Sequence, residues 1–171
     1  MSVAAWAGSS VRRRARCSSA VSSACRINLL QWDYAGPVHG MTDGDTLDLG
    51  RHRLRFWETP HVHHWDSMMV VEETTESLFP VDLFIQPGEQ PPVVRDDLGA
   101  EMCAWYQAAG LFGGADPVLR VVARTERLAP DWIHPMHGGS LPEAIVPRYV
   151  SALRTRPFSY DGRLFGRRLP E

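Results

Sequence analysis

Residues 58–69 read Glu58-Thr59-Pro60-His61-Val62-His63-His64-Trp65-Asp66-Ser67-Met68-Met69. This segment holds three of the seven histidines of the chain and two carboxylates, and it runs directly into an apolar stretch. Imidazoles and carboxylates are the usual protein ligands of zinc, iron and manganese. Loops held by strand ends are places where such ligands converge. The segment therefore predicts one part of a metal site whose other ligands come from elsewhere in the chain.

Size and composition are those of an ordinary globular chain. The 171 residues fit one domain with its own core, or a large piece of a bigger domain. A net charge of −2 argues against nucleic acid or an acidic membrane surface as a partner. No apolar run approaches the roughly 20 residues that cross a bilayer. Cys17, Cys25 and Cys103 are odd in number and widely spaced, which favours reduced thiols in a cytoplasmic protein, and because none lies in a Cys-x-x-Cys pair, cysteine metal ligands are improbable.

The N-terminal segment has an unusual composition. The first 32 residues contain no Asp or Glu, while five arginines accumulate among Ser and Ala. Taken alone, this composition resembles an organellar transit peptide. The rival interpretations are a surface helix and strand whose acidic partners lie elsewhere, or a chain that starts at an internal methionine.

Periodicity predicts hairpins followed by helices. Alternation and turn signals predict strands at 46–49, 52–57, 68–72 and 77–79, paired as two hairpins, and a short buried strand at 131–133. Helical spacing predicts helices at 19–30, 96–111, 117–127 and 142–154, the third with Asp116 as its N-cap. Residues 85–94 are predicted as an exposed loop, and the residues after 154 as a polar tail. This order predicts a single α/β domain with a mixed sheet.

Metal-type ligands occur in three loops that follow predicted strands: the histidine cluster at 61–64, Asp82, and the pair His134 and His137. A lone histidine is more often a surface or core residue, and an Asp at a strand end is more often a turn former. The repeated position after a strand favours metal binding, because loops gathered at one edge of a sheet commonly build a site.

Three motifs in this order resemble the metallo-β-lactamase fold, and most closely its flavodiiron branch of oxygen- and nitric-oxide-reducing proteins. They occupy residues 59–68, 78–84 and 133–138. In that branch a Pro-x-x-His segment runs into Asp-Ser-Met, an Asp follows the next strand, and a final His-Gly closes the site. The resemblance implies His63 as a metal ligand, with His64 as the alternate if Trp65 anchors the alignment.

The same resemblance implies roles for the two later motifs. Asp82 would be the carboxylate that bridges two metals, and His137 would be the last ligand of the second metal. Gly138 and Gly139 then have two interpretations, an anion cradle before a helix or a flexible loop that lets His137 reach the metals, and we favour the flexible loop.

One motif of the family is missing. The earlier His-x-(His/Glu)-x-Asp motif, which supplies most ligands of the dinuclear centre, does not occur upstream of His61. We therefore favour truncation over a targeting segment, and expect residues 1–171 to form the C-terminal portion of an αββα sandwich, an incomplete domain whose mixed sheet is flanked by helices. Only a short tail follows His137, without a loop for a flavin phosphate, so no flavin is expected in this chain.

These features define the expected function. The full-length form is expected to bind a dinuclear Fe or Zn centre and to act on a small-molecule substrate, as a metal-dependent hydrolase or as an O2- or NO-reducing oxidoreductase. The alternative is a non-catalytic remnant or interaction module. For the isolated chain we expect weak metal affinity, poor solubility and no activity, with no nucleic-acid or membrane partner and with a homodimer left open.

Overall fold

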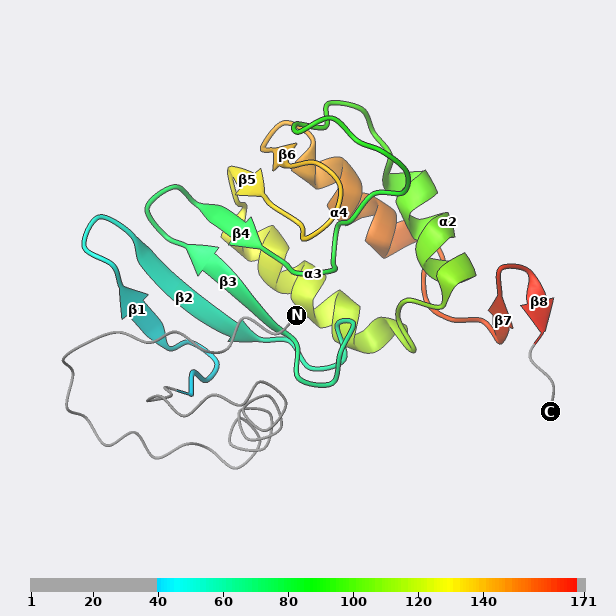
Figure 1. The fold of residues 1–171 in the computed structure, drawn as a ribbon, viewed down its shortest axis with the longest axis horizontal. Helices are drawn as coiled ribbons and strands as arrows, with labels where there is room; N and C mark the ends of the chain where they lie inside the picture. The colour runs from blue at the N-terminus through cyan, green and yellow to red at the C-terminus, as the bar shows by residue number, and fades with distance from the viewer. Residues whose placement is uncertain (1–39, 169–171) are drawn as a thin grey trace.

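The computed structural model describes residues 40–168, so the predicted helix at 19–30, Cys17 and Cys25 lie outside the described residues. Figure 1 shows the elements in chain order: β1 (Thr46–Asp48), β2 (Arg53–Glu58), β3 (Met68–Glu72), β4 (Ser77–Phe79), α2 (Gly99–Ala109), α3 (Ala115–Leu128), β5 (Trp132–Ile133), β6 (Leu141–Pro142), α4 (Val146–Thr155), β7 (Arg163–Leu164) and β8 (Arg167–Arg168).

Strands β1 to β6 form one mixed sheet in sequence order. Neighbouring strands are antiparallel except β4 and β5, which run parallel because the chain crosses over through α2 and α3 between them. The two predicted hairpins are confirmed: β1 pairs with β2 across a turn at Gly50, whose φ is 86°, and β3 pairs with β4. The predicted α/β fold with a mixed sheet is therefore confirmed.

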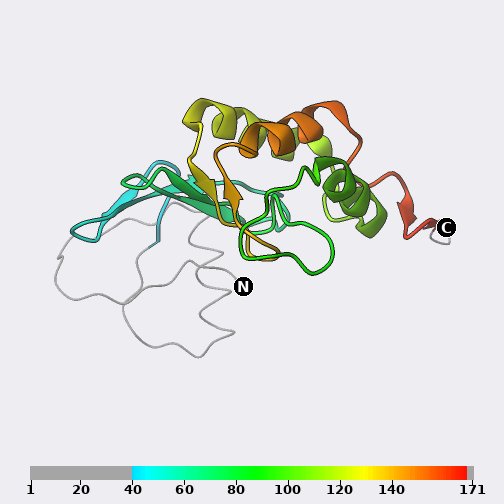
Figure 2. The same cartoon turned by 90° about the horizontal axis from the view of Figure 1, so that it is seen from above.

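The main core lies between the sheet and the helices. Figure 2 shows α3 and α4 over one face of the sheet, with α2 beside α4. Register places one set of buried residues on this face, namely Trp57, Met69, Val71, Leu78, Ile133 and Leu141. Burial of each such side chain contributes about 1.5–3 kcal/mol. Within residues 40–168, no helix combines the length and the apolar character that a membrane span requires.

The opposite face of the sheet is also rich in apolar residues. By register it carries Leu47, Leu54, Phe56, Val70, Phe79 and Trp132. Helices α3 and α4 lie on the other side of the sheet (Figure 2). Phe56 is only 7% exposed, whereas Phe79 is 42% exposed. Poor solubility remains a prediction, and exposed aromatic surface of this kind is its physical basis.

All three helix starts predicted within residues 40–168 are displaced, and α2 begins at Gly99 instead of residue 96. The N-cap of α3 is Gly114, and Asp116 lies inside the first turn of the helix. The last helix begins at Val146 because residues 141–142 are paired with β5 as strand β6. Pro147 lies in the first turn of α4 and marks the helix start. Its ring favours the helical φ, and the N–H that proline lacks would have no hydrogen-bond partner in the first turn.

Two segments predicted to be irregular and exposed are more ordered than expected. Within residues 85–94, Ile85, Gln86 and Val94 are 4%, 5% and 1% exposed, so the interpretation as an exposed loop is wrong for these positions. The predicted polar tail contains the two-residue strands β7 and β8, which pair with each other. Both differences arise from tertiary contacts that leave no periodic pattern in the sequence.

The Glu72 side chain organises the turn between β3 and β4. Its carboxylate accepts hydrogen bonds from the N–H groups of Thr74 and Thr75, at 2.9 and 2.8 Å, and from the Thr75 hydroxyl. These hydrogen bonds hold the pKa of Glu72 well below its ordinary value of 4.5, and the bond from the Thr75 hydroxyl has the largest effect. His52 Nδ1 lies 3.3 Å from the same carboxylate.

Glu72 is therefore expected to link stability to pH. Because its folded-state pKa is depressed, its contribution is complete above the unfolded-state pKa of about 4.3 and is lost as the pH falls toward the lower folded-state value. We expect Glu72→Gln to flatten the dependence of unfolding free energy on pH below about pH 4, measured by urea denaturation. Glu76→Gln removes an exposed carboxylate from the same turn and should keep the wild-type slope; equal slopes in all three proteins would contradict this assignment.

Candidate metal centre

Asp82 lies in a tight loop directly after β4. Residues 80–84 turn sharply, and the Leu83 N–H donates to the Pro80 carbonyl oxygen at 3.1 Å. Val81 and Phe84 have positive φ values of 56° and 68°, a conformation that costs most for a β-branched residue such as valine. Such strain persists only where the surrounding structure imposes it, and it occurs most often at functional sites.

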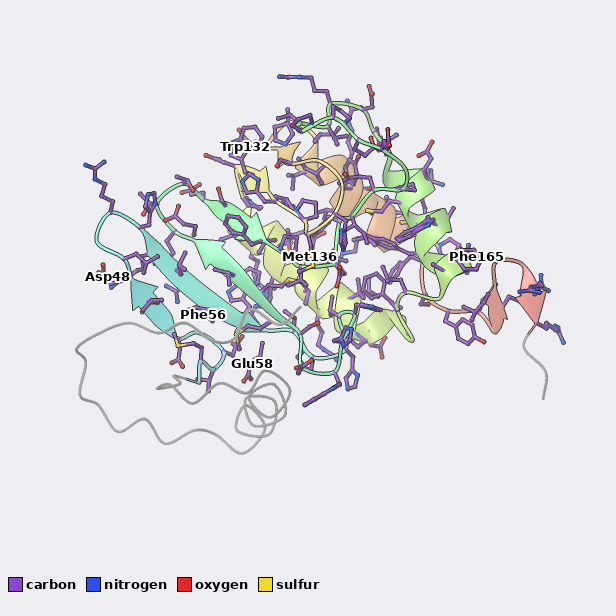
Figure 3. The ribbon with its side chains drawn as sticks, viewed as in Figure 1. Asp48, Phe56, Glu58, Trp132, Met136 and Phe165 are labelled. Carbon is purple, nitrogen blue, oxygen red and sulfur yellow. The ribbon has the colours of Figure 1, made fainter. Side chains whose placement is uncertain are left out.

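His137 is brought to Asp82 by the parallel pairing of β4 and β5. The His134 N–H donates to the Leu78 carbonyl oxygen at 2.8 Å, and the Met136 N–H donates to the Val81 carbonyl oxygen at 2.7 Å. These bonds carry the pairing beyond the strand ends and align the two loops. His137 Nε2 consequently lies 3.9 Å from Asp82 Oδ1, with the two side chains 68% and 18% exposed. Met136, labelled in Figure 3, lies in the loop after β5 and is 40% exposed.

The glycines after His137 are packed tightly against the loop 85–94. The Gly139 N–H donates to Gln86 Oε1 at 2.9 Å, and the Ser140 N–H donates to the Pro92 carbonyl oxygen at 2.9 Å. Both N–H groups are therefore engaged within the protein, which disfavours an anion cradle. A Cβ at position 139 would lie 2.1 Å from the Pro91 carbonyl oxygen. These glycines permit close approach of two loops, which disfavours the interpretation as a flexible loop.

The histidine cluster forms a compact exposed loop between β2 and β3. The Thr59 N–H donates to the Ser67 carbonyl oxygen at 2.9 Å, and Val62, which is completely buried, anchors the loop. His63 Nδ1 lies 2.8 Å from the Leu111 carbonyl oxygen. Because a carbonyl oxygen only accepts, Nδ1 of His63 carries a proton, so that the neutral ring presents its lone pair at Nε2. This is the tautomer that a metal-binding histidine commonly adopts.

His64 is held differently. Its backbone N–H donates to the Ser67 hydroxyl oxygen at 3.2 Å, and its ring meets the ring of His63 edge-on at 4.9 Å. Its backbone thus contributes to the loop closure. Of the two histidines left open by the sequence, His63 has a ring nitrogen fixed by a backbone partner, and this geometry favours it as the ligand.

Many solved structures resemble this arrangement of strands and helices, and three examples follow, although no family model and no curated protein matches the sequence. The rubredoxin:oxygen oxidoreductase of Desulfovibrio gigas superposes with a TM-score of 0.65 and 24% identity, over 77% of this chain and 35% of that one. The Flv1 flavodiiron core of Synechocystis sp. PCC6803 gives 0.63 and 22%, over 81% and 36%. The chemotaxis sensor ODP from T. denticola gives 0.60 and 16%, over 68% and 50%.

The fold is that of a metallo-β-lactamase-like flavodiiron core. The likeness concerns the fold, because none of these sequences exceeds 24% identity to this chain. The chain spans between 35% and half of the length of these three proteins.

The donors present fit a metal centre of the flavodiiron-like fold in part. The 3.9 Å between His137 Nε2 and Asp82 Oδ1 is slightly less than a metal–nitrogen and a metal–oxygen bond laid end to end, about 4.0–4.3 Å. One cation can therefore contact both atoms. Residues 40–168 nevertheless contain no group of three or more His, Cys, Asp and Glu side chains that could hold a metal ion. Asp82 and His137 alone would not complete a metal site, which needs further donors.

Two other side chains of metal-ligand type, His134 and Cys103, are packed within this fold. The His134 ring stacks on Trp132, with centroids 5.8 Å apart, and lies 5.1 Å from the Phe79 ring (Trp132 is labelled in Figure 3). Burial lowers the pKa of His134, and its Nδ1 is 2.8 Å from the Ser140 hydroxyl. Cys103 is 1% exposed, and burial raises the pKa of its thiol to about 11, so it does not readily form the thiolate that binds metal.

Sequence reasoning missed the groups that hold the candidate ligands. The Leu111 carbonyl oxygen holds His63, and the Gln86 side chain holds the loop of His137. Neither group carries a signal in the sequence, because a backbone carbonyl belongs to every residue and Gln86 lies in a Pro-, Gly- and Gln-rich segment typical of an exposed loop.

Proposed function

We propose that this protein is a metal-binding protein of the flavodiiron-like type, in which Asp82 and His137 are ligands, together with His63, which the described residues do not group with this pair. The observation that carries the proposal is the 3.9 Å approach of the Asp82 carboxylate to the His137 imidazole, two groups from distant parts of the chain. The hydrogen bond from the Met136 N–H to the Val81 carbonyl oxygen aligns the two loops that carry these groups. The positive φ of Val81 costs conformational energy, and strain of this kind is found most often at functional sites.

The proposed centre is dinuclear and contains Fe or Zn. Such ions supply Lewis-acid or redox chemistry, which would serve a metal-dependent hydrolase or an O2- or NO-reducing oxidoreductase. The Asp82 carboxylate has two oxygens and can contact two cations, whereas His137 and His63 each offer one ring nitrogen. The 18% exposure of the Asp82 side chain keeps its carboxylate partly shielded from water, which strengthens its attraction for cations.

A second candidate function is a non-catalytic remnant or interaction module. It is favoured by the lack of a three-donor group among residues 40–168 and by the missing His-x-(His/Glu)-x-Asp motif in the sequence. The two candidates differ in turnover. Metal-dependent O2 consumption or hydrolysis by the Fe- or Zn-loaded chain would support the enzyme, and metal binding without either would support the module.

Metal binding is expected to depend on the Asp82 and His137 pair. Wild-type protein titrated with Co2+ should develop a visible d–d absorption band, with an affinity weaker than that of a complete site. Asp82→Asn and His137→Gln should each weaken this affinity by at least about tenfold, since each removes one of few ligands. His63→Gln should also weaken it, whereas His64→Gln should not.

An exposed histidine away from the pair provides the control for this titration. His52→Gln removes an imidazole that lies beside Glu72 and should bind Co2+ as the wild type does. Equal affinities in the wild type, Asp82→Asn and His137→Gln would refute the assignment, as would a wild type that shows no saturable Co2+ signal.

A further inference from the structure

We infer that Gln86 is a positioning residue that holds the Asp82 loop against the His137 loop, an inference that rests on the proposed metal-binding function. The Gln86 side chain is buried at 5% exposure and uses both ends of its amide. Its Nε2 donates to the Phe84 carbonyl oxygen at 2.6 Å, and its Oε1 accepts the Gly139 N–H at 2.9 Å. One side chain thereby joins the two loops that carry the candidate ligands.

The two loops are joined on both sides of the ligands. Before the ligands, the Met136 N–H donates to the Val81 carbonyl oxygen, so the residues preceding His137 and Asp82 are bonded to each other. After the ligands, Gln86 connects Phe84 to Gly139, each two residues beyond a ligand. The 68% exposed His137 side chain therefore stands on a backbone segment that is fixed at both ends.

The surroundings leave little freedom to replace this amide. A Cβ on Gly138, where φ is 87°, would lie 2.3 Å from Gln86 Oε1. Gly138 therefore provides the space that lets the Gln86 oxygen reach the next N–H. Because the amide is buried and its two partners are a carbonyl and an N–H, its donor and acceptor ends cannot exchange. The Oε1 acceptor makes the bond between the two loops, and the Nε2 donor bonds within the Asp82 loop and orients the amide.

Because of this arrangement, replacing Gln86 should disturb the orientation of the metal ligands more than it disturbs the rest of the fold. Removal of groups that orient metal ligands typically weakens metal affinity by about 10- to 100-fold. The loss arises because each ligand then samples orientations in which its lone pair misses the cation. The inference thus predicts a change in metal affinity that exceeds the effect of losing an ordinary loop hydrogen bond.

The test compares Gln86→Met with Gln90→Met in the whole chain. Methionine keeps the length of the side chain and removes both hydrogen bonds. Gln90 is the matched control, because its Nε2 donates to the Pro87 carbonyl oxygen at 2.6 Å within the same loop and does not reach the His137 segment. Three quantities are measured: the Kd for Co2+ from visible absorption, the hydrogen-exchange rate of the Gly139 amide in metal-free protein, and the melting temperature.

For Gln86→Met we expect a Kd raised by about 10- to 100-fold and a Gly139 amide that exchanges at least about tenfold faster, with both quantities unchanged in Gln90→Met. A variant that melts at a lower temperature but keeps the wild-type Kd would overturn the inference, because Gln86 would then be structural only. Wild-type protein that fails to bind Co2+ would overturn the proposed function and, with it, the inference. Failure of the proposed function is thus seen in the wild type, whereas failure of the inference alone is seen only in the Gln86 variant.

Gln86→Glu decides the question if Gln86→Met does not fold. Glutamate keeps an acceptor for the Gly139 N–H and loses the donor to Phe84. A Gly139 amide protected as in the wild type, together with a Kd within about threefold of the wild-type value, supports the inference. Wild-type protection with a Kd weakened by tenfold or more overturns it, because the ligands would then be displaced although the Gly139 link is intact.

Discussion

Replacement of Phe112 by alanine is expected to lower the free energy of unfolding by about 3–5 kcal/mol. The Phe112 side chain is completely buried, and its ring meets the rings of Tyr106 and Phe158 edge-on at 5.0 and 6.2 Å. Truncation would remove the burial free energy of the ring and leave a cavity between α2 and the segment after α4. The neighbouring aromatic rings would also lose their contacts with the Phe112 ring.

The same substitution is expected to affect the histidine cluster. The His63 ring lies 6.5 Å from the Phe112 ring, and its Nδ1 is bonded to the carbonyl oxygen of the residue before Phe112. A displaced Phe112 would therefore free the His63 ring, which should weaken Co2+ affinity in addition to stability. Urea denaturation measures the first effect, and the visible Co2+ band of the folded variant measures the second.

An exposed aromatic provides the comparison for this prediction. Phe165 is 71% exposed, so Phe165→Ala should change stability by no more than about 0.5 kcal/mol. A loss below about 1 kcal/mol for Phe112→Ala would show that the aromatic cluster around α2 does not form in solution as described.

Gly139→Ala is expected to disrupt the contact between the His137 loop and residues 91–94. The added Cβ would lie 2.1 Å from the Pro91 carbonyl oxygen and 2.8 Å from Val94 Cγ2. The first of these neighbours is backbone and cannot rotate away, so one of the two loops must move. Such overpacking costs about 1–3 kcal/mol and occasionally more. The movement would also break the Gly139 to Gln86 hydrogen bond and separate His137 from Asp82.

Gly113→Ala is the matched control for this steric effect. A Cβ at position 113 would meet no atom within 4 Å, so the change should be neutral or stabilising by up to about 1 kcal/mol through the unfolded state. Thermal unfolding and the Co2+ titration of both variants test the prediction. Gly139→Ala with wild-type stability and wild-type Co2+ affinity would show that the two loops do not approach each other this closely.

Local pattern was sufficient to predict the hairpins and the candidate ligands. The strands at 68–72 and 77–79 were predicted with the bounds that the structure has, because a period of two and a polar turn act over neighbouring residues only. Asp82 and His137 were predicted as metal-type residues from their positions after apolar strands. His63, Asp82 and His137 as metal ligands remain predictions, although Asp82 and His137 do lie together.

Other features depend on partners that are distant in the sequence. Strand β5 was predicted from its apolar residues, but its parallel pairing with β4 was not, and the two-residue strand β6 exists only because β5 provides its hydrogen bonds. Gln86 is buried because its amide meets an N–H 53 residues away, and nothing in the composition of its segment indicates this. His134 is a ligand-type residue whose ring packs against Trp132 and Phe79, two aromatics from different strands.

The sequence alone thus determined which residue types stand at the strand ends, and the motif order that predicted the metallo-β-lactamase-like fold. Only the tertiary structure decided which of these residues meet and what holds them. The physical reason is the distance along the chain over which each kind of interaction acts. Alternation, turns and side-chain chemistry act within a few residues, whereas the approach of His137 to Asp82 depends on the parallel pairing of β4 with β5 and on a buried amide between two loops.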